Sequence, residues 1–289
     1  MKKSFTMMIV SMAIFGTIGV FRIHIPLPSG FTASVRGLIG GLFLLFVCLI
    51  KGQKIDFKKA GKKLPVIILS GVLIGTNWIL LFEAYNHTSI ATATLCYYMA
   101  PVFVTVASSF LFGEKLGTKK VLCLLCAIIG MSFVSGVFNS GSLEISGMGI
   151  ALALSAAVLY ASVVLLNKKL SDIDSTDRTI LQLLSAGIVL LPYSLCCENL
   201  SFANMDFLSV ALLILLGLLH TGVAYLLYFS SMSELPLSYT ALLGYIDPLV
   251  ALVLSVIIGQ SVGVFEIVGG ILILGSSCIG IIVKDKIND

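Results

Sequence analysis

The chain has 289 residues, of which 58% are hydrophobic and 11% are charged, and its formal net charge at pH 7 is +4. Soluble domains carry about 25% charged residues, so this composition excludes a soluble globular protein. One membrane crossing uses about 20 apolar residues, and ten crossings leave only short loops, which excludes a soluble catalytic domain or a nucleic-acid-binding domain.

Apolar runs between charged residues and Pro or Gly breaks predict ten membrane helices. The first run follows Met1-Lys2-Lys3 and is followed by no small-residue cleavage site, so we interpret it as a helix and not as a secretory signal. In chain order, the predicted helices cover residues 4–23, 31–50, 64–86, 90–112, 118–138, 147–166, 179–197, 206–231, 237–259 and 264–283.

Basic residues concentrate on one side of this arrangement. With the N-terminus inside, sixteen of the eighteen Lys and Arg residues fall in inside segments. Only Arg22 lies in an outside loop, and Arg36 falls within a helix. The positive-inside rule therefore predicts a multi-pass protein of a cytoplasmic (plasma) membrane, with both termini cytoplasmic, and we expect a bacterial source.

The two halves of the chain repeat one another. An offset of 147 residues brings Tyr98-x-x-Pro101 onto Tyr245-x-x-Pro248, and one residue of slippage brings Arg36 onto Gln182. Because each half has five helices, the second half must enter the membrane from the opposite side. We therefore predict an all-α integral membrane protein of ten transmembrane helices in two inverted five-helix repeats, residues 1–140 and 141–289.

Two stretches of sequence resemble a known family, the EamA-like branch of the drug/metabolite transporter superfamily. The stretch 71–116 is similar to that family's third and fourth helices, with Pro101 in mid-helix and the ending Gly113-Glu114-Lys115. The stretch 217–275 is similar in pattern but has Gln260 where the usual ending has Glu. The resemblance implies a secondary carrier with a central cavity for amino acids, sugars, nucleosides or amphipathic compounds.

Polar residues inside the predicted helices are candidate functional groups, because a polar side chain in hydrocarbon is costly without a partner or a cavity. Asn77 and Trp78 lie near mid-depth, whereas Glu83 lies near the outer end and, at about 240° around the helix from Asn77, on another face. Glu83 could be a substrate or coupling site, or a helix-end anchor or partner of Arg36. Arg36 could form a structural ion pair, or recognise a carboxylate or phosphate.

Two prolines interrupt corresponding helices near mid-depth. Pro101 and Pro248 cannot bond the carbonyls four residues earlier, those of Tyr97 and Gly244. Matching interruptions in both halves indicate a transport site. The alternative is a pair of kinks that only serve packing.

Tyrosines and one acid accompany these prolines. Tyr97, Tyr98 and Tyr245 each offer an apolar ring with a hydroxyl that can meet a polar solute. Asp247 is the only acid predicted near the midplane, where burial favours its protonated form and would suit proton exchange. It could be a coupling or binding group, or a carboxylate satisfied by neighbouring hydroxyls or backbone.

The eighth predicted helix adds two candidates. His220 lies near mid-depth and could relay protons or bond another helix. Tyr225 occupies the repeat position of Trp78, so each half contributes an aromatic ring. The predicted substrate-binding residues are therefore Asn77, Trp78, Tyr97, Tyr98, His220, Tyr225 and Tyr245.

These features favour a secondary transporter that works by alternating access, with proton coupling as an open question. A non-transporting sensor or assembly protein on the same fold is the alternative. The chain has no metalloprotease, nucleophile-elbow or phosphate-loop motif, so an enzyme is disfavoured, and we expect no catalytic residue, metal or cofactor. The expected partners are a small-molecule substrate and the lipid bilayer, with no nucleic acid; the chain could be a monomer or a homodimer.

Overall fold

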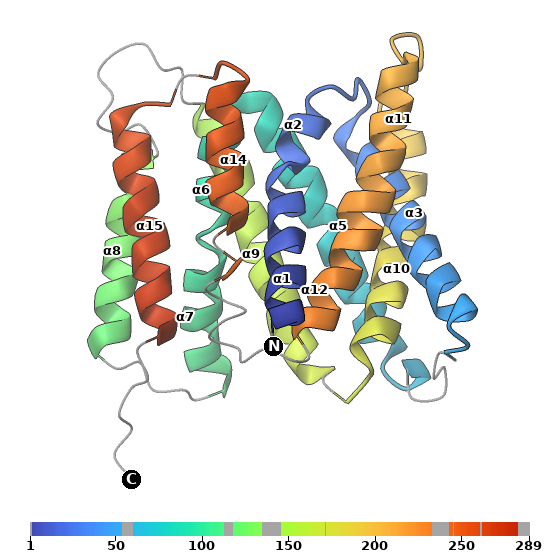
Figure 1. Ribbon diagram of the computed structural model, residues 1–289, viewed down its shortest axis with the longest axis horizontal. Coiled ribbons are helices and arrows are strands. Elements are labelled where there is room, and N and C mark those ends of the chain that lie inside the picture. Colours follow the sequence, from blue (N-terminus) through green and yellow to red (C-terminus); the bar gives the residue numbers. More distant parts are fainter. Residues whose placement is uncertain are drawn as a thin grey trace.

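The computed structural model is helical throughout its regular elements, and most helices run side by side between two opposite faces (Figure 1). It describes residues 2–53, 60–112, 118–134, 146–170, 172–232, 243–244, 246–260 and 262–282. The first half contains α1 Lys2–Gly16, α2 Ile18–Arg22, α3 Ser29–Ile50, α5 Leu64–His87, α6 Ile90–Tyr97, α7 Ala100–Phe112 and α8 Thr118–Val134.

The second half repeats this order of crossings. Its helices are α9 Gly147–Lys169, α10 Ser175–Cys197, α11 Phe207–Leu215, the π-helix η1 Leu216–Val223, α12 Ala224–Met232, α14 Ile246–Ile257 and α15 Val264–Ile282.

Ten crossings result, because α1–α2, α6–α7 and α11–η1–α12 each form one interrupted crossing. Six crossings, including the interrupted α1–α2 and α11–η1–α12, are apolar over at least 18 residues, and the other four contain shorter apolar helices. The start of α1 and the end of α15 lie at the same face, at the bottom of Figure 1. The prediction of ten membrane helices is confirmed; of the predicted ninth helix, residues 237–242 and 245 lie outside the described part.

Three crossings have interruptions with different causes. The break between α6 and α7, at Tyr98 and Met99, lies directly before Pro101 as the sequence predicts. The chain has no proline at the break between α1 and α2, which lies at Thr17, and none in the π-helix η1. A π-helix adds a residue to one turn without changing composition, so a hydropathy pattern does not reveal it.

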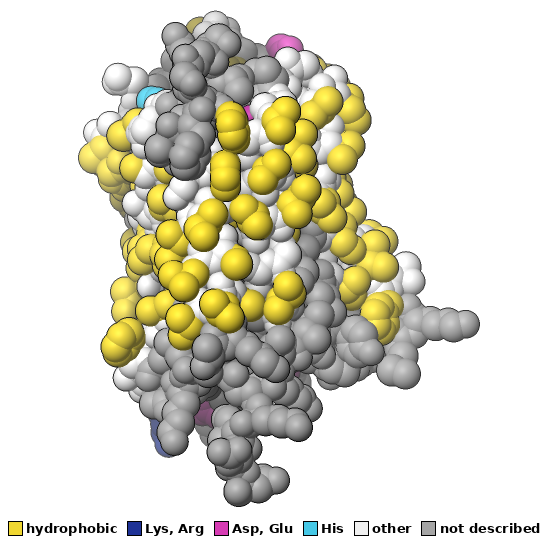
Figure 2. All heavy atoms as spheres, turned by 90° about the vertical axis from the view of Figure 1, so that its left-hand side faces the viewer, with side chains coloured by type: hydrophobic (Ala, Val, Ile, Leu, Met, Phe, Trp, Pro, Cys, Tyr) yellow, Lys and Arg dark blue, Asp and Glu magenta, His cyan; other side chains and the backbone are white. Residues whose placement is uncertain are grey.

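The outer surface is apolar along the helices. Figure 2 shows hydrophobic side chains covering the face formed by α8 and α15. On these helices Ile128 and Ile129 are 52% exposed and Ile271 is 65% exposed. A surface this apolar suits contact with lipid and not with water.

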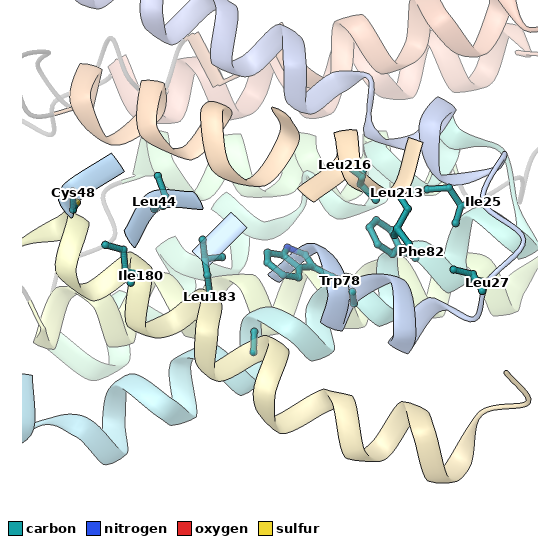
Figure 3. Close-up of a cluster of buried hydrophobic side chains, with 12 residues drawn as sticks. Ile25, Leu27, Leu44, Cys48, Trp78, Phe82, Ile180, Leu183, Leu213 and Leu216 are labelled. Atoms are coloured by element: carbon teal, nitrogen blue, oxygen red, sulfur yellow. The ribbon is translucent and has the colours of Figure 1, made fainter. Parts of the chain in front are cut away.

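The largest buried cluster joins the two halves. Trp78 and Phe82 of α5 pack with Ile180 and Leu183 of α10 and with Leu216 of η1 (Figure 3). The helices approach closely because glycines line them: a Cβ at Gly71 would come within 2.5 Å of the Gln182 carbonyl. The second half's α10 is thus packed against both α3 and α5 of the first half.

Candidate functional site

Arg36 is a cation buried between the two halves. Its side chain is 2% exposed, and its guanidinium carbon lies 4.2 Å from the centre of the Trp78 ring and 5.3 Å from that of Phe82. Its Nε donates a hydrogen bond of 2.9 Å to the Thr221 hydroxyl. Within the described residues, no carboxylate lies within 4.0 Å of its nitrogens. Arg36 therefore has aromatic and hydroxyl neighbours but no counter-ion in this part of the chain.

The alternative that pairs Arg36 with Glu83 is wrong. Glu83 accepts a 2.7 Å hydrogen bond from the Ser29 hydroxyl and lies 3.6 Å from the His87 ring nitrogen. Ser29 in turn accepts a 3.1 Å bond from Arg22, whose guanidinium also binds the carbonyls of residues 25 and 27. Glu83 thus belongs to a polar chain at the helix ends that Ser29 connects to Arg22.

The π-helix brings two polar residues toward the first half. His220 is fully buried, and its Nε2 lies 2.7 Å from the hydroxyl of Thr17, in the break between α1 and α2. Its ring meets the Phe21 ring edge-on, with 4.7 Å between centres. The next residue, Thr221, holds Arg36. An interhelical hydrogen bond of His220 is therefore present, while a proton-relay role stays a prediction.

Asp247 lies in the first turn of α14, next to the break in the fourth crossing. Its side chain is half-buried, and the Tyr98 hydroxyl is within hydrogen-bonding reach of its carboxylate. Tyr98 also donates a 3.0 Å hydrogen bond to the Gly244 carbonyl. Tyr85 and Tyr97 lie within electrostatic range of Asp247. The acid therefore faces tyrosines that come mostly from the first half.

The remaining candidates on α5 and α6 connect helices. The Asn77 amide donates to the Ala156 carbonyl and accepts a 3.4 Å bond from the Tyr97 hydroxyl. The Tyr97 ring lies 5.6 Å from the ring of Tyr160, which belongs to α9. Asn77 thus fastens α5 to α9, an arrangement that also fixes Tyr97.

Arg36 and Asp247 border one group of aromatic side chains. Tyr85 and Tyr97 lie within electrostatic range of both. Tyr225, the repeat counterpart of Trp78, is close to Arg36 and within hydrogen-bonding reach of the Trp78 indole. We call these six residues with Tyr98 the central cluster. Its members are Arg36, Trp78, Tyr85, Tyr97, Tyr98, Tyr225 and Asp247.

Three candidates need separate mention. Tyr245 lies outside the described residues, so its place relative to the central cluster is untested. Pro248 is buried in the first turn of α14, and Pro101 lies in the first turn of α7 directly after the helix break.

Sequence reasoning missed the buried carboxylate of Glu266. It is 2% exposed, accepts a 2.7 Å bond from the Gly263 amide, and also accepts a bond from the Thr92 hydroxyl of α6. The signal was present, because Glu266 is the only acid within the apolar run of the last helix. Its partners lie at the helix ends, and this places it apart from the central cluster.

Comparison with known proteins gives consistent matches along the chain. The sequence profile of the EamA-like transporter family matches residues 2–136 and again residues 147–282. A Bacillus subtilis protein described as "Uncharacterized transporter YxxF" is 32% identical over 277 residues, covering 95% of this chain and 88% of that protein. A second, "Uncharacterized transporter YoaV", is 26% identical and covers 78% of this chain and 77% of that protein.

A solved crystal structure is similar in fold. It aligns with a TM-score of 0.66 at 17% sequence identity and covers 96% of both chains. The arrangement of helices described above is therefore one that occurs in an experimental structure.

Proposed function

Because this chain belongs to the EamA-like transporter family and is a membrane transporter, not an enzyme, we propose that it is a secondary carrier for a small solute with a carboxylate or similar anionic group. The observation that carries this proposal is the buried Arg36 guanidinium, which lies on Trp78 and has no counter-ion within the described residues.

The chemistry of arginine explains the choice of an anionic group. Burying a cation costs several kcal/mol unless it is paired, and the aromatic rings and the Thr221 hydroxyl offset only part of this cost. The planar guanidinium fork matches a carboxylate in geometry. Binding an anionic solute would supply the missing partner. Of the solute classes that the resemblance implies, amino acids and amphipathic carboxylates fit best, since Trp78 and the tyrosines offer apolar rings beside the charge.

Alternating access fits the distribution of the central cluster. Its residues come from α3, α5, α6, α12 and α14, so both repeats contribute. Prolines stand at corresponding positions of the two repeats, Pro101 and Pro248, which supports movement of one half against the other. Asp247 is the proposed coupling group for protons. We further propose cytoplasmic termini, a bacterial cytoplasmic membrane and a boundary between the repeats near residue 140.

Ligand-induced stabilisation tests the proposed anionic substrate. The purified protein is heated with carboxylates, including amino acids, and with the amide of each carboxylate, alongside nucleosides, sugars and quaternary amines. We expect at least one carboxylate to raise the melting temperature and its amide not to. A ligand at about 100 times its Kd adds about 2.7 kcal/mol of stability.

Variants of Arg36 show whether the effect depends on the guanidinium. Arg36→Gln should abolish the ligand-induced shift, and Arg36→Lys should weaken it, because lysine keeps the charge but loses the fork. Lys63→Gln is the matched control, since Lys63 pairs with Asp172 at an exposed site. Stabilisation by quaternary amines alone, or an undiminished shift in Arg36→Gln, would contradict the proposal.

Flux in proteoliposomes separates a carrier from a sensor. A stabilising carboxylate should accumulate in vesicles that contain the protein, and a pH gradient should change its accumulation if Asp247 couples protons. Binding without flux would favour the non-transporting alternative. Flux that does not depend on the pH gradient would contradict the proton-coupling role of Asp247 but not the carrier function.

A further inference from the structure

Two residues before α14, the carbonyl of Gly244 is a backbone acceptor without its usual helical donor. Pro248 has no N–H, so it cannot bond the carbonyl of Gly244, four residues earlier. A backbone carbonyl inside a membrane protein is costly to leave without a donor. Gly244 therefore needs a donor from elsewhere in the molecule.

That donor is Tyr98, which belongs to the other half. Its hydroxyl donates to the Gly244 carbonyl at 3.0 Å. Tyr98 lies in the break between α6 and α7, so this break contacts Gly244, two residues before α14 in the repeat counterpart of that crossing. On another side the same start of α14 is confined by α1, because a Cβ at Gly16 would come within 2.5 Å of the Asp247 carbonyl.

The Tyr98 hydroxyl has a second acceptor within reach, the carboxylate of Asp247. A phenol carries one proton and can donate it to only one acceptor at a time. An ionised carboxylate is the stronger acceptor, whereas a protonated one competes poorly with a backbone carbonyl. The charge of Asp247 therefore decides which of the two acceptors Tyr98 binds.

The other titratable groups around Asp247 do not remove this dependence. Among the described residues, the tyrosines that interact electrostatically with Asp247, besides Tyr98, are Tyr85 of α5, Tyr97 of α6 and Tyr160 of α9. Helices α1 and α2 also pack on α14; their described ionisable side chains are Lys3, which is exposed, and Arg22, which bonds the Ser29 hydroxyl. Phenols stay neutral up to about pH 10, so the carboxyl of Asp247 is the group among these that changes charge at lower pH.

We propose that Tyr98 is a positioning residue that transmits the charge state of Asp247 from one half to the other. With Asp247 neutral, Tyr98 binds only the Gly244 carbonyl and holds the segment before α14 to the break in the fourth crossing. With Asp247 ionised, Tyr98 turns to the carboxylate and releases the carbonyl. The phenol keeps its own proton in both arrangements. This inference rests on the proposed function, for which it gives the coupling a physical link.

Infrared difference spectroscopy of the protein in lipid vesicles, without any solute, tests the switch directly. Spectra are recorded from about pH 4 to about pH 9, a range that includes carboxyl groups shifted by burial. Asp247→Asn identifies the carboxyl band of Asp247, and Tyr98→Phe identifies the ring band of Tyr98, which is sensitive to its hydrogen bond. We expect the two bands to change together at one pH midpoint, and the Tyr98 band to stay constant in Asp247→Asn.

Tyr97→Phe is the matched control, because it removes a neighbouring phenol whose hydroxyl binds Asn77. It should leave the joint change of the two bands intact. A Tyr98 band that stays constant while Asp247 titrates, or an Asp247 band that never appears, would overturn the proposal. Since no transport is measured, these outcomes are separate from a failure of the carrier function, which the flux experiment would show.

Discussion

The fit between α1 and α14 depends on a single missing methyl group. A Cβ at Gly16 would lie 2.5 Å from the Asp247 carbonyl and 2.7 Å from Cβ of Val250. Both neighbours belong to a helix with limited freedom to move, so the contact leaves no space for a side chain. Gly16 therefore allows the first crossing to approach the acid of the central cluster.

We expect Gly16→Ala to destabilise the protein by about 1–3 kcal/mol, the usual range for overpacking. Thermal unfolding in detergent measures the change. Gly275→Ala is the control, since a Cβ there meets no atom within 4 Å and alanine favours a helix. Equal melting temperatures for the two variants would show that α1 and α14 are less closely packed than described here.

The sequence predicts which polar residues lie inside the membrane, but it does not predict which residues they bond. The sequence shows that Pro248 frees the Gly244 carbonyl, yet the donor, Tyr98, comes from the other half. Similarly, Glu83 and Arg36 look like partners by their depth in the membrane. Glu83 instead accepts a hydrogen bond from Ser29, which itself accepts one from Arg22. The depth of a residue in the membrane follows from its position in the helix sequence. The neighbour that its side chain faces depends on how the helices pack, which no local sequence pattern encodes.

Helix ends in this protein are held by side chains from the opposite repeat. Glu198, directly after α10, accepts 2.8 Å hydrogen bonds from the backbone amides of Gly30 and Phe31 in the first turn of α3. The first amides of a helix have no acceptor within it, and a negative charge there is favourable. Glu198 thus acts as an N-terminal cap supplied by the other half.

Glu198→Ala should lower stability by about 1–2 kcal/mol, the range found when a capping side chain is lost. Glu198→Gln keeps one acceptor oxygen and should lose less. Thermal unfolding in detergent gives both values. An alanine variant as stable as the unchanged protein would mean that water satisfies the start of α3 equally well.

At the scale of elements, the sequence predicts those helix ends and breaks that a particular residue type signals, and it misses the others. The seventh helix begins at Ser175 and not at 179, because Asp174 accepts bonds from the Thr176 and Asp177 amides and extends the helix through charged residues. Proline revealed the break before α7. The break at Thr17 and the π-helix η1 have no such signal in the sequence.

The whole molecule should have one labelling pattern if its termini are cytoplasmic. In a variant without its seven native cysteines, Asn199→Cys, in an exposed loop after α10, should react with a membrane-impermeant maleimide on intact cells. Lys3→Cys, exposed near the start of α1 at the opposite face, should react only after lysis. The reverse pattern would invert the proposed orientation while leaving the fold unchanged.

At this largest scale, periodicity and loop charge were enough to predict ten crossings and a repeat. They could not predict how the repeats interlock, because apolar residues that face lipid and those that face another helix have the same hydropathy. Glycines at close contacts, such as Gly41 against Leu184, carry that information only once both helices are placed.

The position of α10 has a consequence for biosynthesis. Gly37 of α3 and Gly71 of α5 both meet backbone carbonyls of α10, which is made after the entire first repeat. Until α10 has been synthesised and inserted, the faces of α3 and α5 that pack on it have no partner. The first repeat therefore cannot complete its native packing before α10 is inserted beside it.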